Sequence, residues 1–162
     1  MDNSIKDPVC GMQVNPDSFA TDYLGMHYAF CSEQCWDRFK ANPHLYVGVP
    51  GEEAPRQKGM EVIKQRHFHL DQKLIDAEAA LLEEQLSAMM GIKHIEVAGD
   101  TIDITYDLLL VTAEQIETCV GQTGMRLGTG LGERLQRGFI HDFEEIEIDS
   151  MEVRPRPLPI KP

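Results

Sequence analysis

The sequence has no long hydrophobic run, little positive charge and few cysteines, and each shortage excludes a class of protein. No stretch of about 18 or more apolar residues occurs, so we expect no membrane span. Lys and Arg number 15 against 27 Asp and Glu, which gives a net charge of −12. Because nucleic-acid affinity depends on clustered Lys and Arg, this balance argues against a nucleic-acid partner and favours cations or basic protein partners.

The first residues of the chain bear on the expected cellular location. Residues 1–6 lack the charged and apolar regions of a signal peptide, so we expect a soluble cytoplasmic protein. Thiols stay reduced in that compartment, which favours metal ligation or free thiols over a disulfide between Cys31 and Cys35.

Three of the four cysteines, Cys10, Cys31 and Cys35, lie in the first quarter of the chain. Ser32 can cap a helix that follows it, which turns Cys35 back toward Cys31 from the first helical turn. Cys10 is in a Cys-Gly-Met turn after Pro8, a sequence typical of a tight knuckle that exposes sulfur. Three thiolates favour a low-coordinate monovalent soft ion such as Cu(I) or Ag(I), whereas Zn(II) would need a fourth ligand.

The motifs around these cysteines follow one pattern. It opens with Asp-Pro-Val-Cys-Gly-Met, continues with Tyr-x-Gly-x-x-Tyr-x-Phe-Cys-Ser-x-x-Cys and closes with Phe-x-x-Asn-Pro-x-x-Tyr. The chain meets it at residues 7–12, Tyr23, Gly25, Tyr28, Phe30, Cys31, Ser32, Cys35, Phe39, Asn42, Pro43 and Tyr46. The pattern resembles the YHS domain, a small treble-clef-like metal-binding module, over residues 1 to about 48. Such modules occur alone, in heavy-metal P-type ATPases and in oxygenases, so the resemblance implies soft-metal binding and leaves the host process open.

Composition divides the chain into two units. Residues 49–57 combine Pro, Gly and charge without hydrophobic periodicity, which indicates a linker. We expect a metal-binding domain at residues 1–48, whose small core a bound metal would help to hold, and a second domain at residues 58–130. Residues 131–162 are expected to form an acidic extension and a Pro-rich tail.

Hydrophobic periodicity in the second domain alternates between strand and helix. Four strands are expected at Met60–Leu70, Ile92–Val97, Thr101–Tyr106 and Met125–Leu127. Two helices are expected at Gln72–Met90, capped by Asp71, and at the segment from the Thr112 cap to about Gln122. This order is that of the ferredoxin-like βαββαβ sandwich, so the fold class is α+β.

The second domain resembles a further family. Its order of elements, the Gly91-Ile92 junction and the Gly124 turn resemble the heavy-metal-associated domain of copper chaperones and P-type ATPases. The Cys-x-x-Cys of that family would fall near Ile75 and Glu78, where no thiol is present. The resemblance therefore implies the scaffold without the metal site.

Other potential ligands have simpler interpretations. His67 and His69 could present two imidazoles from one strand face, but exposed strand histidines are common and no third ligand is evident nearby. Cys119 lies on the apolar face of its helix and is expected to pack as a small hydrophobic residue. Three more side chains are close in sequence to the cysteines and could complete a coordination sphere, although each is expected to pack: Met12, Met26 and His27.

The C-terminal region carries no recognisable site. Residues 128–132 are Gly-rich but lack the Lys of a phosphate loop, so we interpret them as a hinge. Apolar and acidic residues alternate from Phe139 to Ile148, which is typical of an added edge strand, a surface for a basic partner or a solvated extension. The polyproline-like end is Arg154–Pro162.

No catalytic set emerges from these spacings, so we expect that the protein is not an enzyme. The first hypothesis is a cytoplasmic heavy-metal-binding protein that takes Cu(I), Ag(I) or Zn(II) at Cys10, Cys31 and Cys35. It would exchange the ion with a transporter, such as a metal-transporting ATPase, or with a sensor. The alternative is a non-catalytic accessory module of a transporter or oxygenase in which the metal is purely structural. The exchange rate of the metal distinguishes the two hypotheses.

Overall fold

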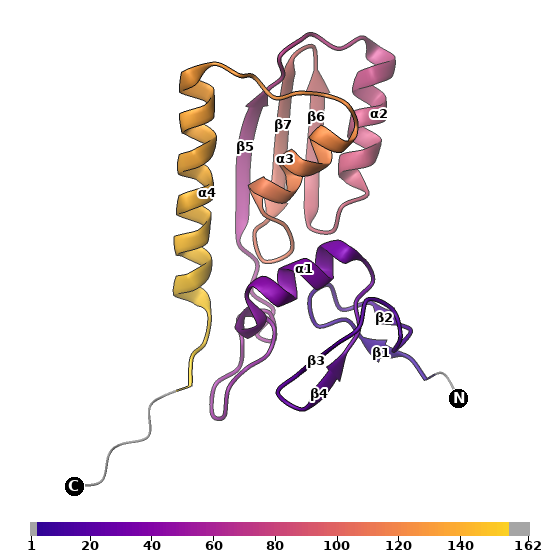
Figure 1. Ribbon diagram of the computed structural model, residues 1–162, viewed down its shortest axis with the longest axis vertical. Helices are drawn as coiled ribbons and strands as arrows, with labels where there is room; N and C mark the ends of the chain where they lie inside the picture. Colours follow the sequence, from indigo (N-terminus) through magenta and orange to yellow (C-terminus); the bar gives the residue numbers. More distant parts are fainter. Residues whose placement is uncertain (1–2, 156–162) are drawn as a thin grey trace, which may run out of the picture.

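A computed structural model describes residues 3–155 of the chain. A small N-terminal unit, from β1 to η1, packs against one end of a larger unit made of one sheet and its helices, from β5 to α4 (Figure 1). Within residues 3–155, no helix is both long and apolar enough to cross a membrane. Most of the Pro-rich end expected at Arg154–Pro162 lies outside the described residues.

The N-terminal unit consists of two pairs of short antiparallel strands and two helical segments. They are β1 (Ile5–Lys6), β2 (Gln13–Val14), β3 (Thr21–Tyr23), β4 (Met26–Tyr28), α1 (Glu33–Ala41) and the 3-10 helix η1 (Pro43–Leu45). Strands β3 and β4 form a hairpin, with Leu24 and Gly25 both at positive φ in its turn. The expected helix is confirmed, because Ser32 caps α1 and Pro43 follows its end.

The aromatic ring of Phe39 on α1 is the centre of the core of the N-terminal unit. Its centroid lies 5.7 Å from that of Tyr23, 5.0 Å from Tyr28, 5.1 Å from Phe30 and 6.3 Å from Tyr46. Ring pairs at these separations attract one another beyond the effect of apolar burial alone. The helix that carries Cys35 is therefore fixed to the hairpin that precedes it.

The larger unit, called the sheet unit below, has a three-stranded antiparallel sheet in the order β5-β7-β6. Its elements are β5 (Ile63–His69), α2 (Asp76–Ser87), β6 (Ile92–Ala98), β7 (Thr101–Asp107), α3 (Ala113–Gln122) and α4 (Leu131–Met151). Thr112 caps α3 as expected, and Gln115 completes the capping box. In Figure 1, α3 lies in front of the sheet, with α2 and α4 on its two sides. The α+β class and the order βαββα are thus confirmed.

Helix α2 is shorter than the expected Gln72–Met90. The backbone N–H groups of Asp71 and Leu74 donate to carbonyls of neighbouring loops, at 2.8 Å each. These hydrogen bonds keep residues 71–74 in a non-helical conformation. The helix begins at Asp76, and the Glu78 carboxylate caps its first turn by accepting from the N–H of Ile75. Asp71 was therefore the wrong cap.

The expected fourth strand, Met125–Leu127, is reduced to a single bridge between Leu127 and Leu70. Two backbone hydrogen bonds make this bridge, from the N–H of Gly128 to the carbonyl of His69 (2.8 Å) and from the N–H of Asp71 to the carbonyl of Arg126 (2.8 Å). The Gly-rich segment that follows is a poor strand former, and it leads the chain away from the sheet. Helix α4 then runs beside β5, on the edge of the sheet where a fourth strand would lie (Figure 1).

The segment from Phe139 to Ile148 was expected to be an edge strand or an extension, but it lies inside α4. Its apolar residues fit helical spacing as well as alternation, and Glu144 and Ile148, four residues apart, are both buried. The Glu144 carboxylate accepts a hydrogen bond from the backbone N–H of Ala113 (2.9 Å) and another from the hydroxyl of Tyr106. Contacts with the sheet unit therefore determine that this segment is a helix and not a strand.

Hydrogen bonds join the N-terminal unit to the sheet unit. The side-chain amide of Gln34 on α1 donates to the carbonyls of Met90 (2.8 Å) and Leu110 (3.1 Å) and accepts from the Met90 N–H (3.1 Å). The Tyr46 hydroxyl donates to the carbonyl of Leu109 (2.5 Å). Buried residues from both units also form one continuous hydrophobic cluster. Each unit therefore covers apolar surface of the other.

The segment expected to be a linker is ordered by contacts with the N-terminal unit. Ala54 is fully buried. The backbone N–H of Arg56 donates to the carbonyl of Leu45 (2.9 Å), and its guanidinium donates to the carbonyl of Val9 (2.8 Å). This segment fixes the position of the loop that carries Cys10.

Candidate metal centre

The structure brings Cys10, Cys31 and Cys35 together. The Sγ atom of Cys31 lies 3.5 Å from the Sγ atoms of both Cys10 and Cys35. A carboxylate oxygen of Asp7 joins the group, and all four potential ligand atoms lie within 4.8 Å of one another. Cys35 is buried, whereas Cys10 and Cys31 are half-buried, so the cluster can be reached from solvent.

Local structure explains the position of each thiol. Strand β4 ends shortly before Cys31, and the Ser32 hydroxyl accepts a hydrogen bond from the N–H of Cys35 (3.4 Å) in the first turn of α1. Cys10 lies in the turn between β1 and β2, where Gly11 has a φ of +83° that favours glycine. The knuckle and the helix start thus face each other, as the sequence predicts.

Asp7 is the residue of this site that the sequence analysis did not single out. One oxygen of its fully buried carboxylate accepts hydrogen bonds from the N–H groups of Val9 (2.8 Å) and Cys10 (3.3 Å). The other oxygen accepts from the N–H of Cys31 (2.8 Å). Asp7 therefore fixes the backbones of two cysteines that are 21 residues apart. The signal was the Asp-Pro step at the start of the motif, since Asp side chains often hydrogen-bond the backbone two residues ahead.

The three thiols differ in acidity. The neighbouring Cys35 thiol, acting as hydrogen-bond donor, lowers the pKa of Cys10 to about 7. Burial raises the pKa of Cys31 to about 11. The pKa of Cys35 is raised, first by its hydrogen bond to Cys10 and then by burial. Two of the thiols therefore hold their protons at neutral pH, and a cation among the sulfurs would replace those protons.

The sulfur spacing fits a single bound ion. With metal–sulfur bonds of about 2.3 Å, two thiolates on a tetrahedral ion lie about 3.8 Å apart. The 3.5 Å separations around Cys31 are close to this value, so binding would need only small side-chain movements. Thiolate donors select soft ions over hard ones.

The neighbouring candidate ligands lie outside this cluster. Both ring nitrogens of His27 are already hydrogen-bonded, one to Asp22 (2.7 Å) and one to the carbonyl of Pro16 (2.7 Å). Met12 and Met26 are exposed, and the backbone N–H of Met12, as a hydrogen-bond donor, helps to lower the pKa of Cys10. The imidazole of His27 is therefore held by other partners than the thiols.

The remaining candidates do not form a metal cluster. The ring of His67 is hydrogen-bonded to the Asp103 carboxylate, and it contacts the ring of His69 on the exposed face of the sheet. Among residues 3–155, the group around Cys31 is the one place where three such donors converge. Cys119 is half-buried against the core, and burial raises its pKa, consistent with a packing role.

Replacement of Asp7 by Asn tests its role in positioning the cysteines. Asn keeps the shape of the side chain and one acceptor oxygen. The oxygen that accepts from the N–H of Cys31 is replaced by an NH2 group, which is a donor. We expect metal affinity to fall about 10- to 100-fold, the range typical of groups that orient ligands. Competition with a chromophoric chelator measures this affinity, with Asp22→Asn as the control because the Asp22 carboxylate is exposed and hydrogen-bonds the ring of His27. Equal affinities of the two variants would contradict the positioning role.

One of three comparisons with known proteins identifies a family for the N-terminal residues. The family model of the YHS domain matches residues 5–49. A solution structure from Bacillus anthracis str. Ames, of a protein provisionally named as copper-ion-binding, aligns with a TM-score of 0.40 and 17% identity. That alignment covers 43% of this chain and 100% of the other. A comparison with curated proteins gave no match. Residues 5–49, which contain the three clustered cysteines, therefore form a YHS domain.

Proposed function

We propose that the protein binds one soft transition-metal ion, Cu(I), Ag(I) or Zn(II), at Cys10, Cys31 and Cys35 and passes it to a transporter or sensor. The observation that carries this proposal is the cluster of three sulfurs centred on Cys31, with two 3.5 Å separations and two half-exposed thiols. A metal that must be handed over needs an accessible site, because the receiving ligand has to approach the ion.

The donor set favours a monovalent ion. Zn(II) in a closed site takes four ligands, and the fourth group at this site is Asp7. Both oxygens of that carboxylate already accept backbone hydrogen bonds that hold the cysteines in place. Three sulfurs without a free fourth donor suit Cu(I) or Ag(I), which accept low coordination numbers.

The alternative, a structural metal in an accessory module, makes the fold depend on the ion. The shared hydrophobic core opposes this dependence, because Phe30, Phe39 and Tyr46 are buried together with Leu109 and Val111 of the sheet unit. Apolar burial of this kind stabilises the N-terminal unit without help from a metal. We therefore infer that the ion can leave while the fold remains.

Removal of the metal tests this inference. We expect native mass spectrometry of protein kept anaerobic to show one ion per chain, and chelation to remove that ion. Far-ultraviolet circular dichroism should then change little, because the fold does not depend on the ion. The unfolding temperature should fall, because a ligand that binds the folded state stabilises it. Loss of helical signal on chelation would support a structural site instead, and absence of any bound soft metal at saturating Cu(I) would contradict the proposal as a whole.

The same proposal includes a cytoplasmic location, a metal-transporting ATPase as partner and no catalytic activity. The net charge of −12 supports a basic docking surface on that partner, since opposite charges raise association rates.

A further inference from the structure

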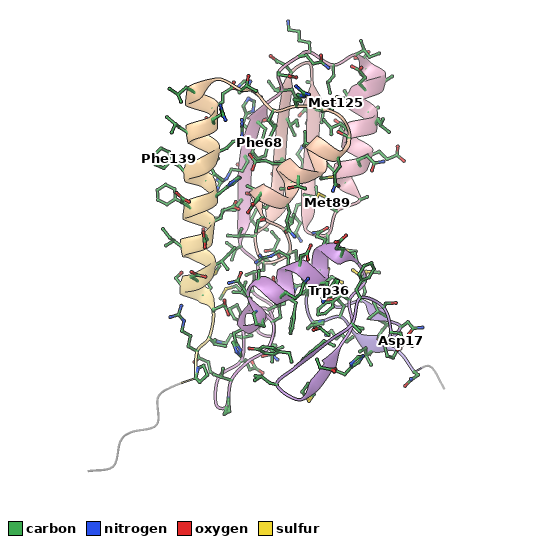
Figure 2. All side chains as sticks on the ribbon, viewed as in Figure 1. Asp17, Trp36, Phe68, Met89, Met125 and Phe139 are labelled. Carbon is green, nitrogen blue, oxygen red and sulfur yellow. The ribbon has the colours of Figure 1, made fainter. Side chains whose placement is uncertain are left out.

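Helix α4 exposes a row of large hydrophobic side chains. They are Leu131, Leu135, Phe139, Phe143 and Ile146, with exposed fractions of 75%, 54%, 60%, 67% and 65%. Successive members are four, four, four and three residues apart, so they lie on one face of the helix. Figure 2 shows the Phe139 side chain directed away from the rest of the molecule. These five residues form an apolar stripe along most of α4.

The opposite face of α4 already has its partners. Glu144 and Ile148 are buried against the sheet unit, and Arg137 forms an ion pair with Glu117 (3.1 Å). The apolar stripe therefore cannot turn inward without breaking these contacts. Contiguous apolar surface of this kind on a soluble domain is typical of an interaction site.

Two charged residues on α4 indicate which kind of partner can pack against the apolar stripe. Arg134 and Glu145 stand 11 positions apart, which is close to three helical turns, so they lie on the same flank of the stripe. Their midpoint falls next to Phe139. Neither residue forms an ion pair within residues 3–155. A second α4 laid antiparallel across Phe139 would place Arg134 of each copy beside Glu145 of the other.

We propose that two copies of this chain associate through their α4 helices as an antiparallel, two-fold symmetric dimer. Such an interface is self-complementary, because each copy supplies both the same stripe and both charges. A parallel two-fold pair would instead place the Arg134 and Glu145 flanks of the two copies on opposite sides of the interface, so these charges would not meet. The antiparallel arrangement is thus the one that satisfies hydrophobic and charged groups together.

The size of the stripe sets the strength of the dimer. From Leu131 to Ile146 it spans about 22 Å of helix. Two half-exposed Phe and three aliphatic side chains bury on the order of 500 Å² per copy, somewhat less than the roughly 800 Å² of a standard interface. The dimer is therefore in rapid equilibrium with the monomer and depends on protein concentration.

Sedimentation equilibrium of the full chain, from roughly 1 μM to 1 mM, tests the association. We expect a reversible monomer–dimer equilibrium in the unmodified protein. Phe139→Lys should weaken the dimer at least about tenfold, because a charge enters the centre of the stripe. Leu81→Lys is the matched control, since Leu81 is an exposed hydrophobic residue on α2 (49% exposed) and should leave the equilibrium unchanged. A monomer throughout this range, or equal effects of the two variants, overturns the proposal.

Charge reversal tests the antiparallel arrangement. Arg134→Glu and Glu145→Arg should each weaken the dimer by bringing like charges together at low salt. The double variant restores opposite charges across the interface, so it should recover most of the lost affinity. Circular dichroism of every variant checks that α4 is retained. A double variant that dimerises no better than the single variants overturns the antiparallel pairing.

Discussion

Cys31→Ser is expected to abolish binding of the soft metal. Cys31 is the central thiol, with its sulfur 3.5 Å from the sulfurs of both Cys10 and Cys35. Serine keeps the size of the side chain but replaces a soft thiolate by a hard, protonated hydroxyl. The affinity should therefore fall by more than the roughly 100-fold that is typical when a group supporting a ligand is lost.

The measurement is metal stoichiometry by native mass spectrometry, together with competition against a Cu(I) chelator under anaerobic conditions. Cys119→Ser is the matched control, because Cys119 packs on the core of the sheet unit and lies outside the cluster. One ion per chain in Cys31→Ser, held as tightly as in the control, would exclude Cys31 as a ligand.

Phe39→Ala is expected to lower the free energy of unfolding by about 3–5 kcal/mol, the cost typical of a deleted buried aromatic ring. The ring of Phe39 is 1% exposed and contacts four other aromatic rings. Its removal leaves a cavity between α1 and the hairpin, where neighbouring rings cannot all close in. Urea denaturation measures the loss.

The same substitution at Phe19 is the control. Phe19 is 45% exposed and contacts Trp36 at 6.2 Å, so Phe19→Ala should cost only about 1 kcal/mol. A loss in Phe39→Ala as small as that of the control would contradict its central place in the core.

Unfolding curves also report on the shared core. The single tryptophan, Trp36, lies on α1 in the N-terminal unit, whereas most helical residues belong to the sheet unit. Because one hydrophobic cluster spans both units, tryptophan fluorescence and far-ultraviolet circular dichroism should show the same midpoint. Two separate midpoints would mean that the units unfold independently.

The elements that the sequence predicted well are governed by neighbouring residues. Helix α1 follows Ser32 as expected, because the Ser32 hydroxyl accepts from a free N–H group of the first turn, and Pro43 prevents continuation of the helix. The hairpin turn at Leu24 and Gly25 is likewise local, since glycine adopts positive φ readily. The approach of Cys35 to Cys31 follows from the start of that helix. Its spacing could be derived without knowledge of the rest of the fold.

Several features were missed because distant parts of the chain decide them. Asp7 is positioned by a hydrogen bond to Cys31, which no local pattern indicates. Helix α2 starts late because Asp71 and Leu74 donate to loops that come later in the sequence. The last strand is a different case, because the Gly-rich segment that limits it to the bridge at Leu127 follows directly in the sequence.

The sequence by itself determined the composition of the candidate site, three thiols held by a capped helix and a glycine turn. It also determined the α+β class, since capping and turn preferences act between residues close in the chain. Only the tertiary structure determined the secondary structure of residues 131–151. Their apolar residues fit a strand or a helix equally, and buried contacts of Glu144 and Ile148 with the sheet unit select the helix. The same contacts leave Phe139 and its neighbours facing outward, because a helix can bury only one face against a single sheet.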